Sequence, residues 1–281
     1  MIETTGRINS YTREGLVFDV LDEGPLDGEV VVLLHGFPQL NTSWNKVAPL
    51  LHADGFRTLA PNQRGYSPGA RPKGRRPYVT TELFKDVVEL IDMVGGKAHV
   101  VGHDWGAMVA WGLAMVHPDK VRTLTAVSVP HPGAFMRAMP KGQILDSWYM
   151  AMFNIPRLPE WLMTNPKLSR FFLDKFGMKA DARAAYQRDF GDGAALKGGL
   201  GWYRALPFAN RRLFGIHVTV PTTYVWSDRD AALGRAGAEL CERYVDAPYR
   251  FIELNGVSHW IPDEVPDELA EAILDRIGSG S

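Results

Sequence analysis

The sequence has little of what would place it in a specialised class of protein. It contains one cysteine, Cys241, among 281 residues, which excludes an intrachain disulfide. Its 31 basic and 32 acidic residues leave a net charge of −1, so neither a nucleic acid nor an acidic membrane surface is expected as a partner. No apolar run reaches the roughly 20 residues of a membrane helix, and residues 1–7 lack a signal-peptide pattern. We therefore expect a cytoplasmic globular protein.

Strand-like and helix-like segments alternate along the chain, which predicts an α/β fold with a mostly parallel sheet flanked by helices. Residues 11–21, with a turn at Gly15, predict an antiparallel edge, and the wholly apolar run 30–34 predicts a strand buried on both faces. Further strands are expected at 56–60, 98–101, 121–129, 219–226 and 249–254. Helices are expected at 44–53, 81–94, 107–116, 235–245 and 265–277.

The alternation stops between residues 134 and 214. This segment shows no strand pattern and consists of short helical stretches, rich in aromatic residues and separated by prolines. We predict a helical cap at 134–214, inserted between the two parts of an α/β core at 1–133 and 215–277. The Gly-Ser tail at 278–281 is typical of an added flexible linker.

The motif that organises the chain is Gly102-His103-Asp104-Trp105-Gly106, which follows a predicted strand and precedes a predicted helix. A strand, then Gly-x-nucleophile-x-Gly, then a helix is the nucleophile-elbow pattern. Its glycines are needed because side chains there would collide with the neighbouring strand and helix beside a strained turn. The central residue is Asp104, where an esterase carries serine. A carboxylate in that place can attack carbon and form an ester.

Acidic and histidine side chains follow the last two predicted strands, where reactive groups of a parallel sheet gather. His259 follows the final strand, and Asp230 or Asp228 follows the one before it. The order nucleophile, acid, histidine is that of the α/β-hydrolase triad. Because Asp104 is already ionised near pH 7, His259 is expected to activate the water that cleaves an ester.

Two backbone N–H groups are expected to hold the oxyanion that forms during ester cleavage. One is that of Trp105, directly after the proposed nucleophile, and the other is that of Phe37, in His35-Gly36-Phe37-Pro38. His35 and His103 are expected to be structural, shaping the oxyanion loop and the elbow.

The motifs at 35–38, 102–106 and 256–260 together resemble the epoxide-hydrolase branch of the α/β-hydrolase family. The resemblance covers residues 7–133 and 215–277. It favours Asp230 over Asp228, because Asp230 takes the fourth place of a Gly-x-x-Asp pattern in which Ser227 replaces glycine. It also implies two cap tyrosines that hold the epoxide oxygen: Tyr203, in Gly201-Trp202-Tyr203-Arg204, and Tyr149, in the looser match Ser147-Trp148-Tyr149-Met150.

This resemblance implies an epoxide hydrolase that forms an ester on Asp104 and releases a vicinal diol. Epoxide opening expels an alkoxide far more basic than a phenol of pKa about 10, so Tyr149 and Tyr203 would assist as proton donors. The aromatic cap favours an apolar epoxide, with Trp148, Phe153 and Trp202 expected in the pocket wall. Water is the second substrate, no metal or cofactor is needed, and the protein would be a monomer or a homodimer.

Three alternatives remain on the residues alone. A haloalkane dehalogenase uses the same nucleophile and histidine, and Trp105 could hold its halide. Halide leaves without a proton, however, so the pair of cap tyrosines would have no role. A haloacetate dehalogenase would need arginines near the nucleophile, where Trp105 and Met108 stand instead. A small-molecule binding protein with a hydrolase fold would not need the complete triad pattern.

Overall fold

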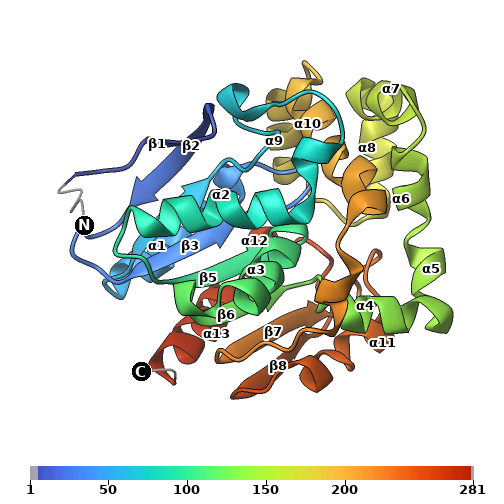
Figure 1. The fold of residues 1–281 in the computed structure, drawn as a ribbon. Coiled ribbons are helices and arrows are strands. Elements are labelled where there is room, and N and C mark those ends of the chain that lie inside the picture. The colour runs from blue at the N-terminus through green and yellow to red at the C-terminus, as the bar shows by residue number, and fades with distance from the viewer. Residues whose placement is uncertain (1–5, 280–281) are drawn as a thin grey trace.

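The computed structural model describes residues 6–279 and contains one sheet of eight strands in the order β1-β2-β4-β3-β5-β6-β7-β8 (Figure 1). The pairs β1–β2 and β2–β4 are antiparallel, and all other neighbours are parallel. The predicted α/β fold is therefore confirmed. The strands are β1 (Ser10–Arg13), β2 (Leu16–Glu23), β3 (Val30–Leu34), β4 (Arg57–Pro61), β5 (Ala98–His103), β6 (Val121–Val127), β7 (Thr222–Ser227) and β8 (Tyr249–Leu254).

Helices cover both faces of this sheet, and each face has its own apolar core. Side chains of β3 alternate between the cores, with Val32 on one side and Val31 on the other. The first core includes helices α2 (Thr80–Asp92) and α3 (Trp105–Val116), and the second includes α1 (Ala48–Ala53), α12 (Ile261–Glu264) and α13 (Pro266–Gly278). The α2 helix forms close to its predicted range because its apolar residues recur at helical spacing, and five of them are buried: Leu83, Phe84, Val87, Leu90 and Ile91.

A group of helices between β6 and β7 lies over one end of the sheet (Figure 1). We call residues 132–215 the cap segment. Its described residues contain no strand. Its elements are α4 (Pro132–Ala138), η5 (Met139–Lys141), α5 (Gln143–Asp146), α6 (Trp148–Phe153), α7 (Leu158–Thr164), α8 (Pro166–Lys175), α9 (Ala180–Phe190), α10 (Ala194–Ala205), η6 (Leu206–Phe208) and η7 (Arg211–Gly215).

The α10 helix is the cap element that packs most closely on the core. A Cβ atom at Gly198 would lie 1.8 Å from the Gly65 carbonyl oxygen, so only glycine permits this approach. The loop that carries Gly65 is anchored by a buried, two-pronged ion pair between Arg64 and Asp86. The Trp202 indole of α10 donates to the Arg64 carbonyl at 2.7 Å, which fixes the helix along this loop.

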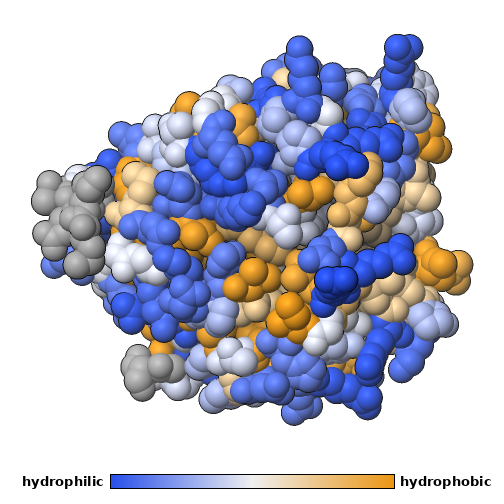
Figure 2. All heavy atoms as spheres, in the orientation of Figure 1, coloured by the Kyte–Doolittle hydropathy of each residue, from blue (hydrophilic) through white to orange (hydrophobic). Residues whose placement is uncertain are grey.

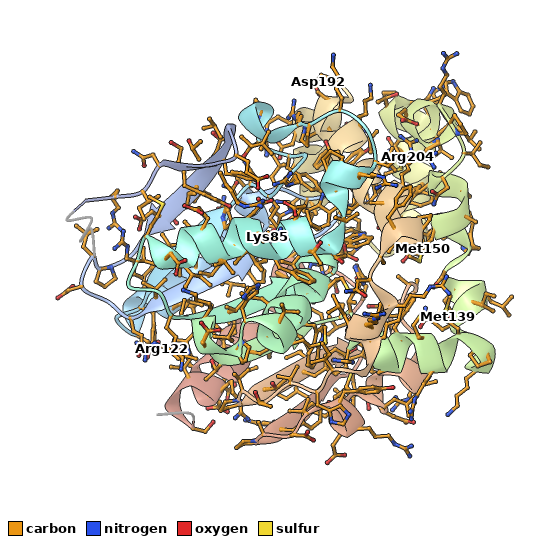
Figure 3. The ribbon with its side chains drawn as sticks, viewed as in Figure 1. Lys85, Arg122, Met139, Met150, Asp192 and Arg204 are labelled. Carbon is orange, nitrogen blue, oxygen red and sulfur yellow. The ribbon has the colours of Figure 1, made fainter. Side chains whose placement is uncertain are left out.

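Other polar contacts fix the cap helices to one another and to the core. Arg204 of α10, labelled in Figure 3, forms a two-pronged ion pair with Glu160 of α7. The Trp260 indole, from the core, donates to the Phe176 carbonyl in the cap at 2.9 Å. On the face in Figure 2, hydrophobic residues lie among hydrophilic ones near the junction of core and cap.

Two predicted helices are shorter than expected. The segment 44–53 divides into the 3-10 turn η1 (Asn41–Trp44) and α1, and 235–245 divides into α11 (Arg235–Ala238) and η8 (Cys241–Tyr244). At the end of the second segment the backbone pairs with Val218, whose N–H donates to the Tyr244 carbonyl and whose carbonyl accepts from the Asp246 N–H. The remaining 3-10 turns are η2 (Pro68–Ala70), η3 (Arg76–Tyr78) and η4 (Pro118–Lys120).

The ends of the chain bear on two predictions. Residues 1–5, part of the stretch that lacks a signal pattern, lie outside the described residues, as do Gly280 and Ser281 of the expected linker. Gly278 is the last residue of α13, and the Ser279 hydroxyl donates to the Asp275 carbonyl. Within 6–279, no helix is both long and apolar enough to cross a membrane.

Candidate active site

Asp104 stands at the sharp turn between β5 and α3, as the elbow motif predicts. Its backbone has φ 52° and ψ −121°, a strained conformation for a residue other than glycine. A Cβ atom at Gly102 would lie 2.2 Å from the Gly106 carbonyl oxygen, and one at Gly106 would lie 2.0 Å from that of Leu34. The flanking glycines are thus required by close backbone packing, and the turn raises the Asp104 carboxylate above the sheet.

His259 and Asp230 lie beside this carboxylate, on loops that follow β8 and β7. The Nδ1 atom of His259 is 2.7 Å from Oδ2 of Asp230, and its Nε2 atom is 3.5 Å from Oδ2 of Asp104. The second oxygen of Asp230 accepts backbone N–H bonds from Ala232 and Leu233, which hold it in place. Asp228 instead accepts from the Gly256 backbone, so the structure brings Asp230 and not Asp228 to the histidine.

The charges of these three buried groups depend on one another. Burial alone would lower the pKa of His259, but the charge of Asp230 and the contact with Asp104 raise it to about 10. Burial alone would raise the pKa of Asp104, but His259 outweighs it and holds that pKa below its usual value. At neutral pH the site therefore holds an imidazolium between two carboxylates.

The backbone amide of Phe37 lies at the other side of the Asp104 carboxylate and donates to Oδ1 at 2.7 Å. Gly36 permits this approach, since a Cβ atom there would lie 2.4 Å from the Cβ atom of Asp104. Trp105 is the first residue of α3, where amides have no acceptor within the helix. The Phe37 amide therefore contacts the carboxylate, and the Trp105 amide, which has no acceptor within the helix, directly follows Asp104 in the chain.

His35 and His103 contact the backbone around these donors. His35 Nε2 accepts from the Gln63 amide at 3.1 Å, and His103 Nε2 lies 2.8 Å from the His259 carbonyl oxygen. Burial lowers the pKa of each imidazole to about 4, so both are neutral near pH 7. Their contacts are those of residues that hold loops in place.

Tyr203 of α10 and Tyr149 of α6 face Asp104 from the cap. Both line the two cavities that reach Asp104, and their ring centroids are 6.3 Å apart. The Tyr203 ring packs edge-on against Phe37 and Trp105, so contacts from the core fix it. Burial, followed by the charge of Asp104, raises the pKa of both phenols, which therefore stay protonated.

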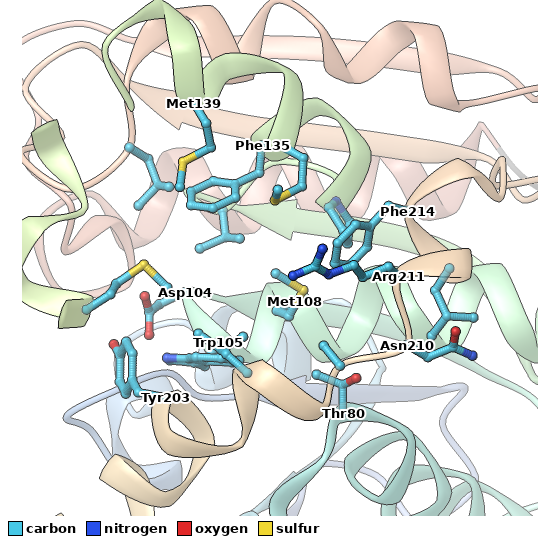
Figure 4. Close-up of a pocket in the computed structure, with 18 of the residues that line it drawn as sticks. Thr80, Asp104, Trp105, Met108, Phe135, Met139, Tyr203, Asn210, Arg211 and Phe214 are labelled. Carbon is cyan, nitrogen blue, oxygen red and sulfur yellow. The ribbon is translucent and has the colours of Figure 1, made fainter. Parts of the chain in front are cut away.

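The larger cavity has a volume of about 250 Å³ and is walled mainly by apolar side chains (Figure 4). Asp104, Tyr203 and Trp105 lie at one end of it in this view, and Asn210, Arg211 and Phe214 lie at the other. Five methionines contribute to its wall: Met108, Met115, Met136, Met139 and Met150. Flexible, polarisable methionines suit a pocket that accommodates apolar ligands of varied shape.

A smaller cavity of about 30 Å³ lies on the His259 side of Asp104. Both tyrosines, Phe153 and Trp260 help to enclose it. This volume is sufficient for one water molecule, and the site offers several polar groups to hold it.

The expected pocket wall is partly wrong. Phe153 lines the smaller cavity, but Trp148 and Trp202 line neither cavity. Trp148 is 43% exposed, with the Lys175 ammonium 4.8 Å from its ring centroid, because α6 turns Tyr149 inward and Trp148 outward. Trp202 is fully buried between core and cap, where its indole is bonded to the Arg64 carbonyl.

Several cavity residues were missed by the sequence analysis, most clearly Thr80, Asn210 and Arg211. They belong to α2 and to the segment at η7, far from every motif. The concentration of methionines between residues 108 and 152 was the one available signal for the cavity wall. Within residues 6–279, no cluster of three or more His, Cys, Asp or Glu side chains is arranged to hold a metal ion.

Comparisons with known proteins give a consistent result. A family model described as "Alpha/beta hydrolase family" matches residues 31–272. The chain is 34% identical to AB hydrolase superfamily protein YfhM of Bacillus subtilis, over 94% of this chain and 95% of that one. It is 32% identical to Epoxide hydrolase 2 of Caenorhabditis elegans, over 88% and 73%. The crystal structure of Epoxide Hydrolase A from Mycobacterium thermoresistibile superposes with a TM-score of 0.85 at 27% identity, covering 96% and 97%.

Proposed function

Because the chain belongs to the alpha/beta hydrolase family and resembles its epoxide hydrolases, we propose that it is an epoxide hydrolase. It opens an apolar epoxide to a vicinal diol through an ester on Asp104. The observation that carries this proposal is the meeting of Asp104 with two protonated phenols, Tyr149 and Tyr203, on the wall of one apolar cavity. This arrangement suits an epoxide. Its oxygen leaves one carbon as an alkoxide but stays bonded to the other, and it needs a proton donor nearby.

In the first step, a carboxylate oxygen of Asp104 attacks an epoxide carbon, and the bond from that carbon to the epoxide oxygen breaks. The oxygen receives a proton from Tyr149 or Tyr203, which gives a hydroxyl group on the ester. Proton donation by a placed side chain contributes about 10²–10⁴-fold to a rate. The tyrosine regains a proton as His259 loses one, so no net charge is left on the phenol.

In the second step, water attacks the ester carbonyl. Esterification removes the charge of Asp104, one of the two carboxylates that raise the pKa of His259, so the imidazole becomes neutral and can take a proton from water. The amides of Phe37 and Trp105 would hold the resulting oxyanion. As the ester bond breaks, the leaving diol oxygen takes the proton from His259. The Asp104 carboxyl group formed in this step then gives its own proton to His259, which restores the starting carboxylate and imidazolium.

The smaller cavity supports the placement of this water. It has room for one molecule and is bounded by both Asp104 and His259. Asp230 keeps the Nδ1 atom of His259 occupied, which directs Nε2 toward the Asp104 side. A water molecule there would contact the base and the ester at once.

A single-turnover reaction in ¹⁸O-water tests the covalent step. With enzyme in excess over styrene oxide, the first diol should carry no label, because its new oxygen comes from Asp104. The label should appear in the Asp104 carboxylate and reach the diol in later turnovers. Labelled diol in the first turnover would exclude the ester.

A matched variant controls this experiment. Asp228→Asn alters a neighbouring carboxylate that caps the Gly256 loop and does not contact His259, so its labelling should follow the wild type. Asp104→Asn should lose turnover. A parallel assay with 1-chlorobutane tests the dehalogenase alternative, since halide release requires no phenol and fast release would contradict the proposal.

A further inference from the structure

The far end of the larger cavity contains a cation that the proposed reaction does not use. Arg211, the first residue of η7, lines the cavity, and its guanidinium points inward beside Met108 (Figure 4). Within residues 6–279, no carboxylate forms an ion pair with Arg211, although many other arginines of the chain are paired. An unpaired guanidinium beside apolar walls is a ready partner for an anion.

The charges that line this cavity are divided between its two ends. Among its described lining residues, Asp104 is the one carboxylate and Arg211 is the one cation. The remaining wall is mostly methionine, phenylalanine and leucine. An anionic ligand is therefore repelled from the Asp104 end and attracted to the Arg211 end, with its apolar part between them.

Two further donors stand at the same end. The side-chain oxygen of Asn210 accepts from the Arg212 amide at 3.2 Å, which leaves its NH₂ group to donate. The Thr80 hydroxyl, on the first residue of α2, also lines the cavity. Carboxylates accept several hydrogen bonds, and arginine binds them with two.

We propose that Arg211 selects epoxides that carry a carboxylate at the opposite end of an apolar body from the epoxide. This inference rests on the proposed function, because it names the substrate class of the same site. Arg211 binds the carboxylate at the far end of the cavity, the methionine-rich wall covers the body, and the epoxide is thereby directed to Asp104. Arg211 is a specificity residue and takes no part in bond making.

A matched pair of substrates tests the inference. An epoxyoctanoate with its epoxide at the terminal carbons and the corresponding epoxyoctanamide differ only in the group at the other end, which is a charged carboxylate in one and a neutral amide in the other. The wild type should show a higher kcat/KM for the acid, and Arg211→Gln should lower the acid-to-amide ratio by about fivefold or more, mainly through KM. The preference should also weaken as salt is added.

Arg212→Gln is the matched control. Arg212 is the next residue along the chain, is exposed as Arg211 is, carries the same charge and does not line the cavity, so the acid-to-amide ratio should stay at the wild-type value. An acid that is no better than the amide in the wild type, or an equal loss for both substrates in Arg211→Gln, would overturn the inference while leaving the epoxide hydrolase proposal intact.

A binding measurement separates the two proposals. Octanoate and octanamide contain no epoxide, and their affinities can be compared by calorimetry whether or not the enzyme opens an epoxide. The wild type should bind octanoate more tightly, and Arg211→Gln should abolish the difference. Equal binding of both by the wild type would overturn the role of Arg211. A clear octanoate preference without any epoxide turnover would support that role and contradict the proposed activity.

Discussion

The Nε2 atom of His259 lies 3.5 Å from Oδ2 of Asp104. This distance is long for a hydrogen bond but short for a pair of opposite charges. The contact contributes to the raised pKa of His259, about 10, and to the lowered pKa of Asp104. The same imidazole must act as a base once Asp104 is esterified, so the charge of Asp104 determines which role His259 has.

The first prediction concerns this coupling. Asp104→Asn removes one of the two carboxylates that raise the pKa of His259, so the pKa should fall from about 10, with Asp230 still holding the ring. The pKa is measured by NMR titration of the imidazole. Asp228→Asn serves as the control and should leave it unchanged. An unchanged pKa in Asp104→Asn would show that the two groups are not coupled.

The same coupling affects the stability of the fold. The folded-state pKa of His259 lies above its ordinary value of 6.5, so its imidazolium stabilises the fold fully below pH 6.5 and loses this effect as the pH rises toward 10. The free energy of unfolding, measured by urea denaturation, should therefore fall between pH 6.5 and 10 in the wild type. In His259→Gln the decline should be smaller, and equal slopes would contradict the raised pKa.

The same His259→Gln variant tests the order of the two chemical steps. His259→Gln should still form the ester, because Asp104 needs no base, but should hydrolyse it very slowly. Mass spectrometry of the intact protein after incubation with styrene oxide should show one added substrate mass. His217→Gln, which changes an exposed histidine paired with Asp246, should show no accumulation. An unmodified His259→Gln protein would contradict this expectation, because it would make the proton that His259 returns to the tyrosine essential for ester formation.

The two cap tyrosines should differ from a third tyrosine of the cap. Tyr203→Phe and Tyr149→Phe remove the proton donors and should each slow epoxide opening by about 10²-fold. Tyr186→Phe is the control, because its hydroxyl donates to the Met163 carbonyl and does not line either cavity. Stopped-flow measurement of ester formation gives the relevant rate. An equal, small effect for all three would indicate that the tyrosines only pack.

The docking of α10 on the core provides a prediction about stability. Gly198→Ala improves helix propensity, yet its Cβ would meet the Gly65 carbonyl oxygen. We expect a loss of about 1–3 kcal/mol in the free energy of unfolding, together with reduced activity through Tyr203. Gly215→Ala adds a methyl group with no neighbour within 4 Å and should change neither. A more stable Gly198→Ala protein would contradict the close packing.

The sequence alone was sufficient where the cause is local. The elbow at Gly102 to Gly106 was predicted because its glycines are needed by the immediate backbone, and the strands and most helices followed from periodicity. The order of Asp104, Asp230 and His259 was also readable, because each follows a strand of one parallel sheet. Where the backbone finds a distant partner, local patterns were insufficient: the predicted helix at 235–245 is divided into α11 and η8, and the backbone at Tyr244 and Asp246 pairs with Val218.

The tertiary structure decided what lies between distant segments. It brought Asp230 to His259 and left Asp228 bonded to the Gly256 amide. It turned Tyr149 inward and Trp148 outward, and buried Trp202 against the core. It also placed Arg211 across an apolar cavity from Asp104, although the two residues are far apart in the sequence. Local patterns depend on neighbours along the chain, whereas pocket walls and pKa values depend on neighbours in space, which only packing of the whole chain supplies.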